Sequence, residues 1–332
     1  MIKYIKDLIK IISVSGHEEK IADYIAEKME PFFDSVKKDA LGNLICHKAG
    51  EGKKLMFCAH MDEIGFIVTF IDDDGFVRFA PVGGISFAAA AYSEVVFENG
   101  RTGVIVPEAK TKPADYKADS FVVDLGAKTK KEAERLVKIG DTFAVRPSLT
   151  SLYGQRLCGR PLDDKIGCAA LMEAAEKSAE FKCDVTFVFT VQEEVGIRGA
   201  RTAAFAIAPD YGIAIDVTAT GDAKGADPMA VKLGGGAAIK IKDQSAICDV
   251  TLVEKMKKVS KENGIKSQLE ILPYGGTDAA SMQLAGEGCR AGCISIPTRY
   301  IHSSVETIDL NDVEESVKLT AALCAADLTD LV

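Results

Sequence analysis

Short apolar runs alternate with amphipathic segments along most of the chain. Apolar residues at positions 2, 5, 8, 9 and 12 share one helical face, so the chain is expected to begin with a helix that buries one side. Further helices are expected over 15–29, 163–180, 251–263, 277–286 and the last twenty residues, and strands over 41–50, 53–62, 183–194, 211–218, 237–243, 266–275 and 291–297. Strands that alternate with helices predict an α/β fold with a mostly parallel sheet covered by helices on both faces.

The pattern changes in the middle of the chain, where hairpins replace this alternation. Asp74-Gly75 and Asn99-Gly100 each lie between two runs rich in apolar residues, and both dipeptides are typical of tight hairpin turns. Only one helix is expected in this part. We therefore predict a β-rich domain at 66–155, inserted into a larger domain made of residues 1–65 and 156–332.

Three of the expected helices begin with capping residues. Ser15 and Glu18 have the spacing of a capping box, and so do Thr129 and Glu132. Asp249 directly precedes a later helix. We expect the side chains of Ser15, Thr129 and Asp249 each to accept a hydrogen bond from a backbone N–H in the first turn.

Charge, the length of the apolar runs and the cysteine content limit which partners and which cellular location are expected. The 332-residue chain has a net charge of −9 and a sequence pI of about 5.2, and it has no long basic run, which disfavours a nucleic-acid partner. No apolar run reaches the length needed to span a membrane, and lysines interrupt the apolar pattern of the N-terminus, unlike in a signal peptide. The nine cysteines form no CxxC pair and are expected to be reduced and buried, which favours a cytoplasmic location.

Polar side chains follow several expected strands at the point where each apolar run ends. In a parallel sheet the carboxyl ends of the strands lie at one edge, where ligands bind. The acidic pair Asp163-Asp164 stands at the start of the helix expected over 163–180. We therefore expect one cluster of histidines and carboxylates, made of His60, Asp62, Asp163, Asp164, Glu193, Glu194, Asp216 and His302.

A mixture of imidazoles and carboxylates is the donor set of a metal centre. This set, which contains no thiolate, suits Zn²⁺, Co²⁺ or Mn²⁺; its members are His60, Asp163, Glu194, Asp216 and His302. Five such ligands exceed the needs of a single catalytic zinc. They are enough for two divalent metal ions that share a bridging carboxylate.

Several residues of this cluster have a simpler structural explanation when each is considered alone. Asp163 or Asp164 alone is more typical of a helix cap, and Glu193-Glu194 alone is more typical of a solvated turn. The chain has only four histidines, however, and two of them follow strands beside carboxylates, so a chance cluster is improbable. We expect the other two, His17 and His47, to be structural.

Six segments around these residues stand in the order and spacing of the tetrahedral aminopeptidase (TET) family of co-catalytic metallopeptidases. They are CAHMDEIGF, RPLDDKIGC, VQEEVGIRGA, AIDVTATGD, PYGGTDAAS and IPTRYIHSSVE. The chain resembles this family over essentially its whole length. The family includes glutamyl and deblocking aminopeptidases, and some of its members were labelled endoglucanases. The resemblance implies a zinc-peptidase-like catalytic domain, a dimerisation domain at 66–155 and assembly into a tetrahedral homododecamer.

The resemblance also implies a role for each metal ligand. His60 and Asp216 would hold one metal ion, Glu194 and His302 would hold the other, and Asp163 would bridge them. The implied reaction is the removal of N-terminal residues from short peptides. A water molecule between the two metal ions would be the nucleophile, because the ions lower its pKa.

Further residues are implied to assist catalysis or to bind substrate. Glu193 would act as general base and then as general acid, and Asp62 would hold the second nitrogen of His60. The glycine-rich segment before the helix at 277–286 would line the pocket. Substrate-contacting residues would thus include Gly276, Thr277, Asp278 and Arg299, although Thr277 and Asp278 could equally cap that helix, and Lys165, Arg198 and Arg299 could equally be structural ion-pair partners.

Two other functions compete with this reading. A glycosidase would need paired carboxylates and no metal, but the two histidines argue against it, and so does the absence of tryptophan, since sugar clefts commonly use aromatic platforms. A non-catalytic metal-binding shell would need no spare base, so the Glu193-Glu194 pair argues against that function.

Overall fold

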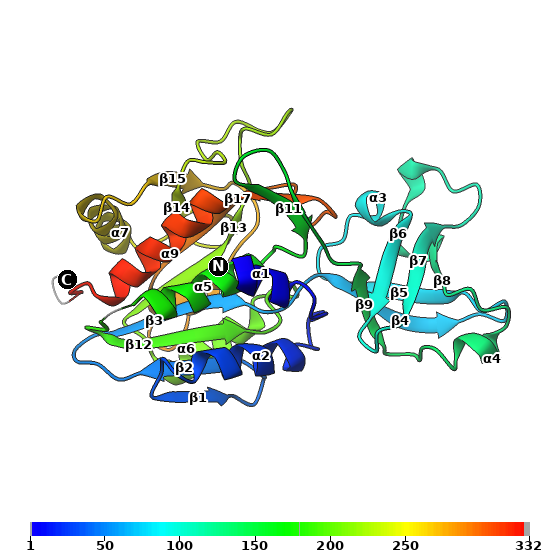
Figure 1. The fold of residues 1–332 in the computed structure, drawn as a ribbon, viewed down its shortest axis with the longest axis horizontal. Coiled ribbons are helices and arrows are strands. Elements are labelled where there is room, and N and C mark those ends of the chain that lie inside the picture. The colour runs from blue at the N-terminus through cyan, green and yellow to red at the C-terminus, as the bar shows by residue number, and fades with distance from the viewer. Residues whose placement is uncertain (1, 179, 329–332) are drawn as a thin grey trace.

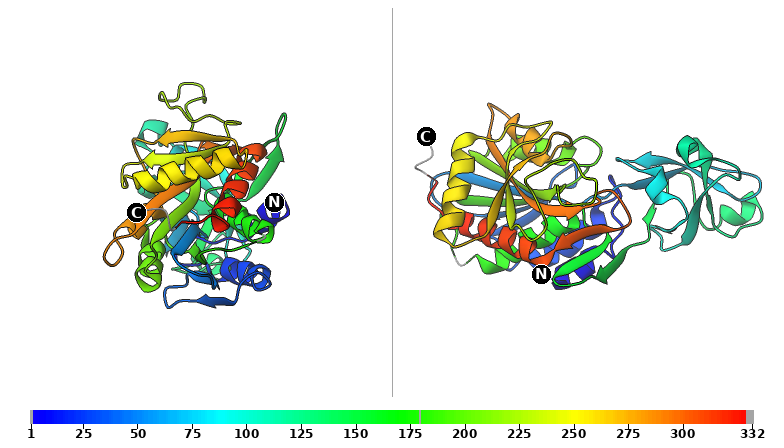
Figure 2. Two further views of the ribbon diagram at one scale, coloured as in Figure 1. Left: turned by 90° about the vertical axis from the view of Figure 1, so that its left-hand side faces the viewer. Right: turned by 90° about the horizontal axis from the view of Figure 1, so that it is seen from above.

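The computed structural model describes residues 2–178 and 180–328. Figure 1 shows a larger domain, in which helices pack on a wide sheet, and a smaller β-rich domain to its right. The smaller domain extends from one end of the larger one, as the view from above in Figure 2 shows. The chain enters and leaves the smaller domain once, so the larger domain is built from two separate stretches of sequence.

The large sheet is mixed, with the order β1-β2-β12-β3-β13-β16-β17-β11-β10 and with β14 and β15 paired beside β16. Its centre is parallel, since β12, β3, β13 and β16 run side by side in one direction, and β14 and β15 form a second parallel pair. The prediction of a mostly parallel sheet therefore holds for the centre and for β14 with β15. It is wrong for the other pairs: a short connection makes the β1–β2 hairpin antiparallel, and β2 with β12 and β11 with β17 are antiparallel as well. The strands are β1 (Ser35–Lys38), β2 (Leu44–Lys48), β3 (Lys54–His60), β10 (Ser148–Ser151), β11 (Arg156–Arg160), β12 (Asp184–Thr190), β13 (Tyr211–Thr218), β14 (Ala237–Lys242), β15 (Ser267–Ile271), β16 (Arg290–Arg299) and β17 (Glu306–Asp309).

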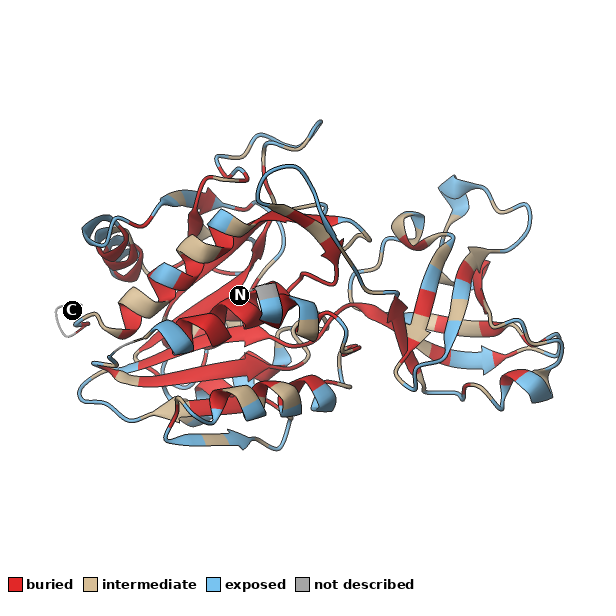
Figure 3. Cartoon of the chain, in the orientation of Figure 1, coloured by how far each residue is buried: buried red, intermediate tan, exposed pale blue. Residues whose placement is uncertain are grey.

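Helices cover both faces of this sheet. Alternate residues of β3 enter different cores: Phe57 packs in the main cluster with α1, α2, α5, α7 and α9, whereas Cys58 packs with α6 and α8 on the opposite face. The central strands are consequently buried along almost their whole length (Figure 3). The helices are α1 (Ile2–Leu8), α2 (Glu19–Met29), α5 (Lys165–Lys177), α6 (Arg198–Ile207), α7 (Val250–Glu262), α8 (Asp278–Gln283) and α9 (Leu310–Cys324).

The smaller domain is a closed barrel with the strand order β4-β5-β8-β7-β6-β9. Stacked and edge-on phenylalanine rings, among them Phe66, Phe79 and Phe143, fill its interior. Strand β10, which the boundary at 155 placed with this domain, pairs with β11 in the large sheet instead. The elements are β4 (Gly65–Ile71), β5 (Val77–Val82), α3 (Phe87–Ala90), β6 (Ser93–Phe97), β7 (Thr102–Pro107), the 3-10 turns Pro113–Asp115 and Ala118–Ser120, β8 (Phe121–Asp124), α4 (Lys130–Ala133) and β9 (Thr142–Val145).

Two of the three predicted helix caps are confirmed, and one is wrong. Thr129 and Asp249 accept N–H groups of the first turn as expected. The capping box at Ser15 and Glu18 is wrong: α2 begins only at Glu19, and the Ser15 hydroxyl donates to Asp62. A short helix in the barrel, α3, was not expected, since its four residues are too few for a periodic pattern.

Two findings bear on the expectations about cysteines and membranes. Each of the nine cysteines lies in the described part of the chain, and each is free. Among residues 2–178 and 180–328, no helix combines the length and apolarity that crossing a bilayer requires.

Candidate metal centre

The residues expected at the strand ends do come together at one edge of the large sheet. His60 is the last residue of β3, and Asp216 lies near the end of β13, two strands that run parallel and adjacent. Glu194 follows β12, and His302 follows β16. Asp163 arrives from the loop between β11 and α5, and its neighbour Asp164 caps α5 by accepting the N–H of Gly167.

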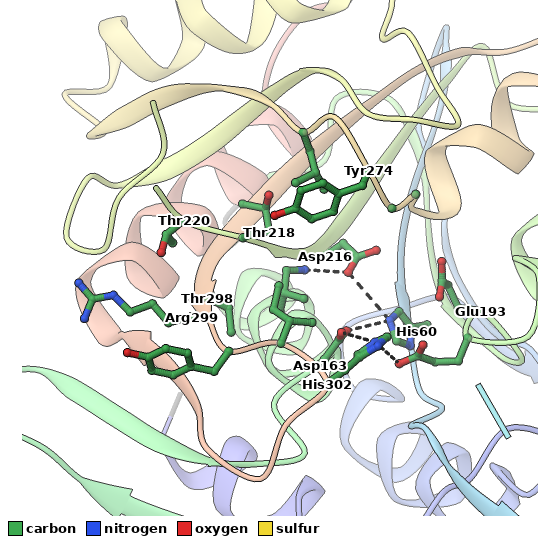
Figure 4. A pocket seen from close by; sticks show the side chains of 18 of the residues that line it. His60, Asp163, Glu193, Asp216, Thr218, Thr220, Tyr274, Thr298, Arg299 and His302 are labelled. Atoms are coloured by element: carbon green, nitrogen blue, oxygen red, sulfur yellow. Dashed lines mark hydrogen bonds and ion pairs between the residues drawn. The ribbon is translucent and has the colours of Figure 1, made fainter. Parts of the chain in front are cut away.

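Asp163 lies at the centre of this cluster (Figure 4). Its Oδ1 is 3.2 Å from Nε2 of His60, which in turn lies 3.9 Å from Oδ1 of Asp216. Its Oδ2 is 3.3 Å from Nε2 of His302, which lies 3.2 Å from Oε1 of Glu194. Each oxygen of Asp163 thus faces a different histidine–carboxylate pair, an arrangement that divides the five side chains into two halves around a shared carboxylate.

Distances between ligand atoms also allow a metal ion in two overlapping groups. His60, Asp163 and Glu194 have ligand atoms within 4.8 Å of one another, and so do His60, Asp164 and Asp216. Asp164 is the member that sequence reasoning assigned no ligand role. Its oxygens accept the N–H groups of His60 and Gly167, so its carboxylate holds the end of β3 against the start of α5.

The clustered carboxylates give this place a strongly negative electrostatic potential. Burial raises the pKa of Glu193 and of Asp216, and neighbouring carboxylates add to the effect. Burial opposes the charged form of His302, but its contacts with Asp163 and Glu194 prevail and raise its pKa to about 11. Likewise, hydrogen bonds with His302 and His60 outweigh burial and hold the pKa of Asp163 below its usual range. Carboxylates in such excess, combined with imidazole nitrogens, fit divalent metal ions.

Asp62 holds the backbone of the glutamate pair. Its carboxylate accepts the N–H of Glu193 at 3.0 Å, the N–H of Glu194 at 3.2 Å and the hydroxyl of Ser15 at 2.6 Å. Nδ1 of His60 lies 3.1 Å from the backbone carbonyl of Asp62 and 3.5 Å from its carboxylate. The carbonyl is therefore the nearer partner of that imidazole, and the carboxylate mainly orders the glutamates.

Glu306, which sequence reasoning did not single out, does the same for two other ligands. Its Oε2 accepts the N–H groups of Leu162 at 2.6 Å and Asp163 at 3.2 Å, and its Oε1 accepts the N–H of His302 at 3.0 Å. Its side chain is buried, and burial raises its pKa to about 7. The available signal was its place at the end of the motif IHSSVE, four residues after His302.

A cavity of about 620 Å³ opens onto the cluster. Glu193, Gly276 and Arg299 line it, and Figure 4 places Glu193 and Arg299 on opposite sides of the view. Two other residues expected to contact substrate are buried outside this lining. Thr277 caps α8, and Asp278 accepts the hydroxyl of Thr190.

The two remaining cations considered earlier have structural partners. Lys165 is fully buried and donates to Glu63 at 2.8 Å, whereas Arg198 donates to Gln192 at 3.1 Å. Neither residue is among those that line the cavity.

Comparison with known proteins gives a consistent result. Residues 42–319 match the M42 glutamyl aminopeptidase family. A protein of Acetivibrio thermocellus named as a putative aminopeptidase is 44% identical over 98% of both chains. A lysyl aminopeptidase of Pyrococcus furiosus is 38% identical over 96% of this chain and 95% of its own. The solved TET1 peptidase of Pyrococcus horikoshii superposes with a TM-score of 0.87 at 38% identity, covering 97% of this chain and 98% of that one.

The fold and the site thus define a metal-dependent peptidase. The chain belongs to the M42 glutamyl aminopeptidase family, and it is accordingly a metallo-aminopeptidase. This assignment sets aside the metal-independent glycosidase and the non-catalytic shell.

Proposed function

We propose that this aminopeptidase removes N-terminal residues from short peptides at a dinuclear metal site. His60 and Asp216 would hold one ion, Glu194 and His302 would hold the other, and Asp163 would bridge them. The observation that carries this proposal is the division of the cluster by Asp163, whose two oxygens lie 3.2 and 3.3 Å from the two histidines. When bound, two such ions supply a water of lowered pKa and polarise the scissile carbonyl.

Glu193 is the proposed general base. It lines the cavity, and its backbone is held by Asp62 at 3.0 Å. From there its carboxylate would take a proton from the nucleophilic water and pass it to the leaving amine.

The adjacent glutamates offer a matched test. Glu193→Gln is expected to keep its metal content and to lose about 10²–10⁴-fold in kcat, because only the proton acceptor is removed. Glu194→Gln is expected to lose metal, because a ligand is removed. Metal analysis and turnover of an aminoacyl amide, before and after chelation and readdition of Zn²⁺, Co²⁺ or Mn²⁺, distinguish the two. Unchanged turnover of Glu193→Gln would exclude it as the base, and two metal equivalents retained by Asp163→Ala would exclude the bridge.

Assembly and location are further parts of the proposal. The TET1 peptidase of Pyrococcus horikoshii can assemble into a tetrahedron or a large octahedral shell. We infer a closed homo-oligomer for this chain too, with the barrel as the dimerisation domain, and the exposed apolar side chains of the barrel support this role. Nine free cysteines favour a reducing compartment such as the cytoplasm.

A further inference from the structure

The cavity wall beyond the metal ligands is mainly apolar. Val217, Leu272, Tyr274, Tyr300 and Ile301 contribute to it. This wall and the metal cluster belong to one continuous cavity, so the side chain of a bound N-terminal residue has this wall within reach. The character of the wall therefore bears on which residues the enzyme removes.

Arg299 is the one charged residue in the described lining outside the metal cluster and Glu193, and its charge is already compensated. Its Nη2 donates to Oδ2 of Asp222 at 2.6 Å, and its Nε donates to Oδ1 at 3.2 Å. A third contact joins Nη2 to the backbone carbonyl of Asp222 at 3.3 Å. Such a two-pronged pair fixes the guanidinium on its partner and leaves little attraction for a second carboxylate.

Two threonine hydroxyls of the wall already donate hydrogen bonds within the protein. Thr218 donates to the buried carboxylate of Glu270 at 2.7 Å, and Thr298 donates to the carbonyl of Ile296 at 3.0 Å. A charged side chain placed against this wall would lose water without gaining an ionic partner, which is costly. An apolar side chain would gain from leaving water.

We propose that the enzyme prefers peptides with an uncharged, mainly apolar N-terminal residue, and that Asp222 is a specificity-determining residue because it neutralises Arg299. This inference rests on the proposed function. The comparisons leave the question open, since the family is described as glutamyl and one relative is named lysyl, which are opposite charges. The wall described above favours neither.

The test is a panel of leucyl, glutamyl and lysyl p-nitroanilides with the metal-loaded enzyme. Leucine is expected to give the highest kcat/KM. Asp222→Asn keeps the size of the side chain but removes its charge, so Arg299 becomes available to an acidic substrate, and the glutamyl-to-leucyl ratio is expected to rise about tenfold or more. Adding Arg299→Met to that variant should abolish the rise. Glu94→Gln, which removes the same kind of partner from Arg146 on the barrel, should leave the ratio unchanged.

Each outcome has a distinct meaning. Cleavage of none of the three substrates by the wild-type enzyme would overturn the proposed function itself. A wild-type preference for glutamate or lysine would overturn the inferred selectivity while leaving the aminopeptidase reaction intact. An unchanged glutamyl-to-leucyl ratio in metal-loaded, folded Asp222→Asn would overturn the role of Asp222, and the wild-type panel remains decisive if that variant fails to fold.

Discussion

At the scale of single residues, two buried carboxylates organise the backbone around the proposed metal ligands. Asp62 accepts the N–H groups of Glu193 and Glu194, and Glu306 accepts those of Asp163 and His302. Neither interaction follows from residue type, because a buried Asp or Glu can serve equally as a ligand, a base or an acceptor. The hydrogen-bond partners determine which of these roles a carboxylate has, and most of these partners come from segments far away in the sequence.

Glu306→Gln is predicted to weaken metal binding. The amide keeps one acceptor oxygen, so one of the two groups of N–H donors loses its partner and the ligands it carries become less well placed. Losing such support typically lowers metal affinity about 10–100-fold. Titration of the metal-free protein with Co²⁺, followed by its visible absorption, measures this loss. Glu314→Gln, on α9 with a half-buried side chain, is the control, and equal Co²⁺ affinity in both variants would contradict the role of Glu306.

At the scale of elements, the first turn of α9 holds the glycine-rich segment that leads into β14. Asp312 accepts the N–H groups of Gly234 and Gly236, each at 2.7 Å. Gly234 and Gly236 both have positive φ, so this segment follows a path that other residues rarely adopt. The helix periodicity of α9 was predictable, but this contact was not, because Asp312 reads as an ordinary acidic residue of a first turn.

The burial of Asp312 predicts a pH dependence of stability. Burial raises the pKa of Asp312 to about 6 in the folded chain, above the value of an unfolded aspartate. The folded state therefore binds the proton more tightly, and the contribution of Asp312 to the free energy of unfolding falls as the pH rises from about 4 to about 6. Asp312→Asn removes this titration. The wild-type minus variant difference in unfolding free energy, measured in denaturant at each pH, should decrease over that interval, and a constant difference would contradict the prediction.

At the scale of the whole molecule, the barrel reaches the proposed metal site. Gly84, between β5 and α3, lies so close to His302 that an added Cβ would stand 3.2 Å from Nδ1 of the imidazole. The neighbouring Gly83 lies similarly near Glu194. The inserted domain thus packs directly against two expected ligands.

The proposed assembly predicts an effect of a charge on the outer surface of the barrel. Phe70 and Ile139 line one hollow of the barrel and are 50% and 68% exposed. If the barrel mediates dimerisation, Ile139→Lys should shift the protein to smaller species in sedimentation velocity, because a charge would have to be desolvated at the contact. Ile139→Leu should assemble like the wild type. Identical assembly of both variants would remove this hollow from the interface.

The sequence by itself was sufficient for the alternation of strands and helices, for a β-rich segment in the middle of the chain and for the residues that meet at the proposed metal site. Apolar periodicity is local, and the carboxyl ends of parallel strands share an edge, so His60, Asp216 and the glutamate pair could be placed together without coordinates. The tertiary structure decided the antiparallel margins of the sheet, the loss of the expected cap at Ser15 and the partners of Glu306. It also paired Arg299 with Asp222, which is 77 residues away in the chain. Hydrogen-bond and ion-pair partners depend on which distant segments pack together, and no local spacing encodes that choice.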